Sequence, residues 1–401
     1  MSIPFDEFAK RIGPGNDESG ETEAESLRKE LKEKLGILPE ITINGSIRIS
    51  DAAKPFARAL DVRELSEEYL SRKMLSSKDS KHVAFVHVHS KEILQIDVPP
   101  GGSAELNLLF LNMEPLVTQV LINVGKGAKL NLSEWYGSKS TKRSLVSVIH
   151  EATLHEYSNV EMNMVHNTDS RTYAAFTSRV VIGDNAKLEF NSIYDGGALT
   201  KVKNDIIAEG YAAKSRITEM VIGSSTQGFD INTVVVNANR DTVSELESKG
   251  AMADGSRCLL KGFADIRENA PGSMSFVHER GILLGKEAHM DSIPGMSIKN
   301  SDVKATHSSA VAPVDEDSLF YLMSRGASMA EARMLLVSGF FSGSFAKITN
   351  PALKEAVASL MREKIYTGAF GSVPKATMSG IWTDADPDSS IFKGHYKYKD
   401  E

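Results

Sequence analysis

The sequence predicts a mainly β protein with helices toward its two ends, and three observations support this prediction. About two hundred residues after Pro99-Pro100-Gly101-Gly102 alternate apolar and polar side chains, with almost no helical periodicity. A similar short phrase recurs within them, and its aligned small residues are Ala104, Ala128, Ala152, Ala186 and Ala213. Helical spacing of apolar residues returns only after Asp315.

The recurring small residue is the most specific of these signals. A small residue that returns roughly every twenty to thirty residues, followed by alternation, is typical of a solenoid coil turning a corner. A parallel sheet with helical crossovers does not fit, because this stretch lacks helices. A large antiparallel sandwich also has short strands separated by turns. The pattern by itself therefore leaves a β-helix and a sandwich open.

The first part of the chain, residues 1–98, is expected to form a mixed helical or α/β module. Leucines within 21–35 make one narrow apolar stripe, which is typical of a solvated helix. From Ile37 to Ile49, isoleucines fall on alternate positions, as in a strand. We expect helix over 51–80 and strand over 82–98.

The last part, residues 314–369, is expected to form a C-terminal helical domain. Asp315 is a favourable residue at a helix start, and Gly326 is typical of the position after a helix end. Ser328 and Glu331 have the spacing of a capping box, so a second helix begins there.

A further helix is expected from Ala352 to Ile365, because Asn350-Pro351 has the composition of a helix start. Residues 370–401 are rich in Gly, Pro, Ser and Asp and are expected to form an extended tail. The β core then occupies residues 99–313.

Composition excludes several classes of function. The net charge of −7 argues against a general nucleic-acid binder, which needs a basic field. No apolar run is long enough to span a membrane, and no GxxxxGK[ST] loop for ATP occurs. The only cysteine, Cys258, fits a reducing compartment. The start of the chain lacks the features of a signal peptide, so we expect a cytoplasmic protein.

The C-terminal third carries an ordered set of motifs. In chain order they are Asp291-Ser292-Ile293-Pro294, Asp302-Val303-Lys304 followed by His307, Asp315 to Gly326, Glu331-Ala332-Arg333, Leu335-Leu336-Val337 and Gly339-Phe340. This set resembles the SufB/SufD family of iron–sulfur cluster assembly proteins, and the middle of the chain matches only by pattern. The resemblance implies a right-handed parallel β-helix between helical regions, and it implies a scaffold subunit that is not itself an enzyme.

Two departures from the SufB pattern indicate a SufD-like chain. Where SufB carries a cysteine that accepts sulfur, this chain has Ser273 to His278 and no thiol. Only a thiolate can hold sulfur as a persulfide. Where SufB has a glutamate directly after the motif histidine, this chain has Ser308. A self-sufficient SufB-like homodimer is therefore disfavoured as the alternative.

His307 is the candidate metal ligand. A neutral imidazole can bind iron, and the residue matches the histidine in the family's terminal coil, which implies a site at a subunit interface. A hydrogen-bonded histidine at the end of a solenoid is the ordinary alternative. His289 could lie near it on an adjoining coil. Any iron or iron–sulfur cluster would be transient and completed by another chain, with none bound tightly by this chain alone.

Other polar residues have simpler interpretations. His87 and His89 fall on one face of the expected strand, where a polar solvent face is commoner than a metal site. Cys258 lies in an apolar strand and is expected to be a buried small hydrophobe. Asp315 and Asp317 are explained by helix capping rather than by acid–base chemistry.

The resemblance also implies partners. A separate SufC-type ATPase would dock on the C-terminal helices, through an apolar surface that includes Leu319, Phe320, Leu335, Leu336, Phe340 and Phe341. These helices could instead pack on the end of the solenoid. A SufB-like or identical subunit would pair edge to edge around His307. Use of a flavin is left open. The rival from another class is a β-helix carbohydrate-active enzyme.

Overall fold

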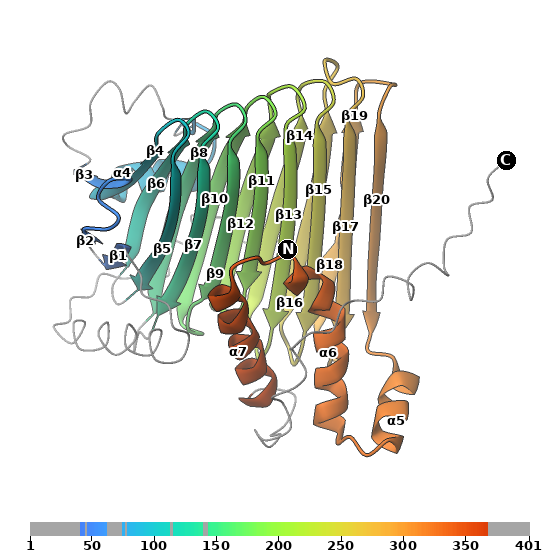
Figure 1. Ribbon diagram of the computed structural model, residues 1–401. Helices are drawn as coiled ribbons and strands as arrows, with labels where there is room; N and C mark the ends of the chain where they lie inside the picture. Colours follow the sequence, from blue (N-terminus) through green and yellow to red (C-terminus); the bar gives the residue numbers. More distant parts are fainter. Residues whose placement is uncertain are drawn as a thin grey trace.

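The computed structural model describes residues 41–44, 46–61, 74–76, 78–112, 115–138 and 143–367 (Figure 1). The helix expected over 21–35 and the tail expected over 370–401 lie outside the described residues. Among the described residues, no helix combines the length and the apolar character that crossing a membrane requires.

Two sheets of ten strands dominate the molecule (Figure 1). Sheet A contains, in spatial order, β2 (Ser46–Ile49), β1 (Ile41–Asn44), β5 (Ser103–Asn112), β7 (Lys129–Ser138), β9 (Asn159–Asn167), β11 (Lys187–Tyr194), β13 (Lys214–Gly223), β15 (Val243–Met252), β17 (Met274–Leu283) and β20 (Lys304–Pro313). Sheet B contains β3 (Ala57–Asp61), β4 (Glu92–Val98), β6 (Leu116–Val124), β8 (Ser144–Leu154), β10 (Thr172–Ile182), β12 (Leu199–Ala208), β14 (Gly228–Asn237), β16 (Arg257–Ile266) and then β18 (His289–Ser292) with β19 (Gly295–Ile298).

From β4 to β18, consecutive strands alternate between the two sheets, and strands within a sheet pair in parallel. In sheet A, the in-register starts of β5, β7, β9, β11, β13, β15, β17 and β20 follow one another every 26 to 31 residues. An antiparallel sandwich cannot give this arrangement. The core is a β-solenoid, as predicted.

The recurring phrase marks a corner where each coil enters sheet A. One residue per coil has positive φ there and donates its N–H to the next coil; these residues are Gly101, Gly127, Tyr157, Asn185, Ala212, Asp241 and Gly272. The next residue is small and buried, as at Ala128, Ala186 and Ala213. Ala104 and Ala152 lie inside strands instead. The predicted period was correct, but two of the five alanines were aligned wrongly.

The N-terminal part differs most from the prediction. Residues 51–56 form turns and β3 follows, so the helix expected over 51–80 is wrong for its described first part. The strand expected over 82–98 is wrong for its first half, because Lys81–His89 is a helix, α4. Its second half is correct and forms β4. The cap at Ser80 and burial of Val83 and Val86 on sheet B outweigh the alternation of the sequence.

Helix α4 is fixed to the outer face of sheet B by polar contacts. His82 is buried and its two ring nitrogens bond Thr177 Oγ1 at 2.8 Å and Ser147 Oγ at 2.9 Å. Burial, with Lys201 nearby, lowers the pKa of His82 to about 4. The imidazole is therefore neutral at ordinary pH.

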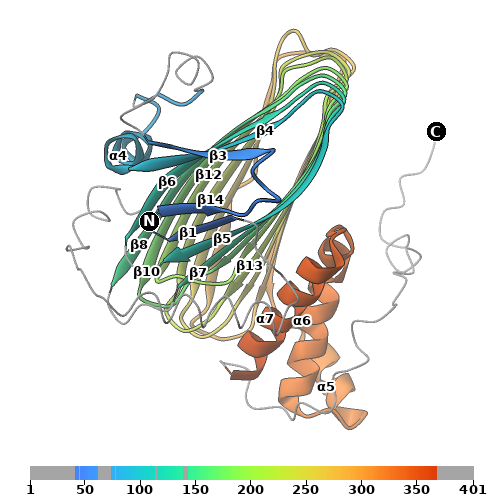
Figure 2. The ribbon, with the colours of Figure 1, turned by 60° about the vertical axis from the view of Figure 1, so that its left-hand side comes forward.

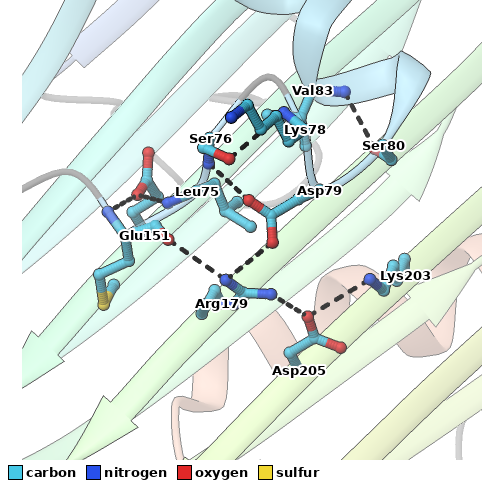
Figure 3. A network of polar contacts seen from close by, with 11 residues as sticks. Leu75, Ser76, Lys78, Asp79, Ser80, Val83, Glu151, Arg179, Lys203 and Asp205 are labelled. Atoms are coloured by element: carbon cyan, nitrogen blue, oxygen red, sulfur yellow. Dashed lines mark hydrogen bonds and ion pairs between the residues drawn. The ribbon is translucent and has the colours of Figure 1, made fainter.

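The segment just before α4 is held by a second set of contacts (Figure 3). Glu151 accepts the N–H of Leu75 at 2.7 Å. Arg179 bridges Asp79, at 3.2 Å, and Asp205, at 2.8 Å. These contacts tie the N-terminal part of the chain to strands β8, β10 and β12.

Three helices follow the solenoid, as predicted: α5 (Glu316–Ser324), α6 (Met329–Ala346) and α7 (Pro351–Thr367). Asp315 caps α5, and Ser328 with Glu331 forms the expected capping box of α6. Figure 2 shows α6 and α7 on the opposite side of the solenoid from α4. Their buried side chains pack on outward residues of sheet A, which include Leu109, Trp135, Val165, Met220 and Ile222. These helices therefore cover the side of the solenoid rather than its end.

Candidate subunit interface at the open end

The two ends of the solenoid are built differently (Figure 1). At the amino-terminal end, the short antiparallel strands β2 and β3 form the edges of the two sheets, and Ile47, Ile49 and Phe56 pack against the core there, so we call this the closed end. At the other end, β20 pairs only with β17, so one edge of this ten-residue strand has no neighbour among the described strands. The matching edge of sheet B is shorter and is split at Ile293-Pro294 into β18 and β19. We call this the open end.

The free edge of β20 presents every second peptide group. Lys304 donates its N–H to the carbonyl of Ser273, just before β17, and Val314, just past β20, donates its N–H to the carbonyl of Leu283. Because N–H directions alternate along a strand, the N–H groups of Ala305, His307, Ser309 and Val311 point to the free edge. A regular exposed edge of this kind is a template for another strand.

His307 ends a column of inward-facing side chains. Its register partners through the coils are, in order, Val277, Leu246, Ile217, Phe190, Met162, Leu132 and Leu106, all buried in the core. His307 is exposed only because no coil follows it. The imidazole thus replaces an apolar residue where the solenoid interior opens to solvent.

A buried carboxylate lies beside this position. Glu279 is paired in register with Ser309 and is 0% exposed. Its Oε2 accepts the hydroxyl of Ser292, and Ser292 Oγ accepts the hydroxyl of Ser309 at 2.7 Å. Burial raises the pKa of Glu279, against the opposing effect of the Ser292 hydrogen bond. A hydrogen-bonded chain therefore links an interior carboxyl group to the surface of the open end.

The backbone makes room for Glu279 at one position. A Cβ on Gly262 of β16 would stand 2.7 Å from Glu279 Oε1. The backbone of Gly262 and of Ile293 lowers the pKa of this carboxyl group and so partly opposes the effect of burial.

On the outer face of sheet A, helix α6 is fastened close to the open end. Glu247 of β15 pairs with Lys249 at 3.2 Å and with Lys347 at the end of α6. Lys249 Nζ also donates to the carbonyl of Phe340 at 3.0 Å. In register beyond Glu247 lie His278 and then Ser308, which bond each other at 2.8 Å.

The predicted partner-binding residues separate into two groups. Phe341 is 0% exposed and packs on sheet A, and Leu319 is also buried, so neither is available to a partner. Phe320 is 74% exposed on α5. Leu335, Leu336 and Phe340 are half-buried on α6. Tyr321, Met323 and Met329 are also exposed, and they were not among the predicted partner-binding residues.

The remaining candidates do not form a site together with His307. His289 faces outward on sheet B and pairs with Asp291 at 3.1 Å, so the structure does not bring it to His307. Cys258 is buried, and burial raises the pKa of its thiol, as expected of a small hydrophobe. The predicted strand with His87 and His89 on one face is wrong, because both residues lie in helix α4. His89 stacks on Phe85 of the same helix.

Within the part of the chain that the structure describes, no three His, Cys, Asp or Glu side chains are grouped as metal ligands. His307 could supply one nitrogen ligand only, so iron would need ligands from a second chain. Sequence reasoning missed Glu279. Its signal was a charged residue in phase with Val277 along an alternating strand.

Fold and open end together define a β-solenoid whose last strand has one edge unpaired among the described strands. Comparison with known proteins gives the family: residues 111–340, more than half of the chain, match the SufBD core domain of SUF-system Fe–S cluster assembly. The chain belongs to this SufBD family.

Relatives that carry the family name agree with this assignment. An iron–sulfur cluster assembly SufBD family protein of Staphylococcus haemolyticus is 24% identical over 351 residues, 85% of this chain and 71% of that protein. One of Staphylococcus epidermidis has the same identity and coverage. One of Staphylococcus saprophyticus is 27% identical over 223 residues, 55% of this chain and 48% of that protein.

Proposed function

We propose that this chain is a non-enzymatic, SufD-like scaffold subunit that pairs with a SufB-like or identical subunit through β20. The free edge of β20 is the observation that carries this proposal. A strand added there would satisfy the peptide groups of the free edge and cover the inward-facing column that ends at His307. His307 would then lie inside the interface and could lend a ligand to a transient iron or cluster.

A SufC-type ATPase is the second proposed partner. Phe320, Tyr321 and Met323 are exposed on α5, which touches the rest of the protein mainly through α6. Exposed aromatic and methionine side chains gathered on one short helix are typical of a docking surface. Because α6 is fastened to β15 through Glu247, force on these helices would reach sheet A near the open end.

Pairing can be tested by blocking the free edge. Ala305→Pro removes an N–H that points to the free edge and leaves the ladder to β17 intact. We expect the full chain to bind a SufB-like protein, or itself, and this variant to bind at least about tenfold more weakly. The measurement is sedimentation or co-purification with the SufC-type ATPase present.

The matched control is Ala59→Pro on β3. This residue also directs its N–H away from its paired strand, but at the closed end. Equal binding by the two variants would contradict pairing through β20.

ATPase docking has its own pair of variants. Phe320→Asp should abolish co-purification of the ATPase, whereas Val88→Asp, equally exposed at 75% on α4, should not. Loss of binding in both variants, or in neither, would place the docking surface elsewhere. Phe341 is unsuitable for this test because it is part of the core.

A further inference from the structure

We propose that Glu279, Ser292 and Ser309 form a proton relay that carries protons from the open end into the solenoid interior. This inference rests on the proposed function, since it assigns chemistry to the same open end. The relay uses no metal ligand of the site, and all three residues belong to this chain.

The hydrogen bonds have a direction. Ser309 donates to Ser292, and Ser292 donates to Glu279 Oε2. The exposed hydroxyl of Ser309 is thus the entrance, and the carboxylate is the final acceptor. Such a chain transfers a proton when each hydroxyl accepts one proton and passes its own inward.

The interior is suited to keep the proton once it arrives. Ser292 from β18, Ser309 from β20 and Gly262 from β16 surround the carboxyl group. In the same column, beyond Ser248, lies Glu219, a second buried carboxylate. Burial raises the pKa of both groups, and the charge of Glu219 adds to the effect on Glu279. Protonation therefore relieves the cost of an isolated interior charge.

Cluster assembly supplies a use for such an acceptor. When hydrosulfide becomes a sulfide that bridges two iron ions, its S–H bond breaks and the electron pair stays on sulfur. Nothing is oxidised or reduced, but one proton must leave. It would bind Ser309, and the relay would end with Glu279 as the neutral acid, so charge and atoms balance.

The contact itself can be tested in the full chain alone. The infrared difference between wild type and Glu279→Gln identifies the carboxyl band of Glu279. Ser292→Ala should shift this band, because it removes the hydrogen bond to Oε2. Ser308→Ala, next to Ser309 but facing outward, should leave it unchanged. A band that is the same in Ser292→Ala and Ser308→Ala overturns the relay.

The role is tested in the assembly with the SufB-like partner and the ATPase. Ferrous iron and sodium sulfide are added, and cluster absorbance is followed in H2O and in D2O. Ser292→Ala and the exposed Ser309→Ala should slow formation about tenfold and change the solvent isotope effect. Ser308→Ala should match wild type.

The two proposals fail in different ways. Wild-type rates in Ser292→Ala and Ser309→Ala, in an assembly that builds clusters, overturn the relay alone. A wild-type assembly that builds none contradicts the proposed function and the relay's use, while the infrared result still decides whether the contact exists.

Discussion

The closed and open ends of the solenoid terminate one column of inward-facing residues with opposite chemistry, whereas a second column, from Ile43 to Val311, is apolar at both ends. The first column begins at Ile49, passes through Ile41, Leu108 and Glu134, and ends at Ser309. Ile49 is half-buried and packs against the core, Ile41 behind it is fully buried, and Ser309 is exposed. A solenoid needs a cap where it must end, with an apolar face on the core and a polar face outside, and a regular edge of unpaired peptide groups where another strand is to join.

The largest difference is expected from truncating Ile41 and Ser309, which lie toward opposite ends of that column. Ile41→Ala should lower the free energy of unfolding by about 2–5 kcal/mol, because it opens a cavity under a fully buried side chain. Ser309→Ala should change it by less than about 0.5 kcal/mol. Urea unfolding followed by circular dichroism measures both. Similar losses in the two variants would contradict the view that only one end is sealed.

Acidification should act on α4 and on the open end with opposite sign. His82 of α4, which bonds β8 and β10 in the middle of sheet B, has a pKa lowered to about 4, so the unfolded chain binds a proton there at higher pH than the folded chain. Its contribution is complete above pH about 6.5 and is lost as pH falls toward about 4, a loss of about 3 kcal/mol. Glu279 has a raised pKa, so its contribution is complete at low pH and is lost as pH rises.

Hydrogen exchange at several pH values tests this sign. Protection of α4 should fall between pH about 6.5 and about 4. Protection of β17 should be higher at the acidic end of that range. Other titrating groups also change protection with pH, and this change is measured in Glu279→Gln and subtracted from the wild-type curve. A variant His82→Gln should remove the fall in α4, and parallel curves for the two segments would refute the assignment.

A smaller effect is expected from the contacts that fasten the N-terminal segment. Arg179→Ala breaks the bridge between Asp79 and Asp205. Because the Arg179 side chain is only 20% exposed, this change should lower the free energy of unfolding by about 1–2 kcal/mol. Arg216 also bridges two carboxylates, Glu189 and Glu245, but is 43% exposed.

Arg216→Ala should therefore cost less than about 0.5 kcal/mol. Thermal unfolding compares the two variants directly. Equal costs would mean that burial does not separate these two networks.

Much of the fold could be predicted from the sequence because its signals are local. Each signal depends on a few neighbouring residues. These signals are the residue with positive φ and the small residue at each corner, the alternation along each strand, and the helix caps at Asp315 and Ser328. The alignment of Ala104 and Ala152 failed because alanine is also an ordinary strand residue. Only the pairing register, which joins residues about thirty positions apart, identifies the corner.

The candidate site was predictable only in part. His307 was found through the family resemblance, and its place at the end of an apolar column follows from the coil register. Glu279 and Ser292 lie on different sheets and meet through the interior. Phe341 and Phe320 are equally apolar in sequence, but only the packing of α6 on sheet A buries one of them. Helix α4 formed against an alternating pattern because sheet B binds its valines and His82.

The most direct test of the central claim is hydrogen exchange at single amides of β20, with and without the SufB-like partner. In the free chain, the amides of Ala305, His307, Ser309 and Val311 should exchange rapidly, while those of alternate residues are protected by β17. Complex formation should slow these four amides at least about tenfold. A complex that forms while all four still exchange rapidly would show that the open end is not the pairing surface.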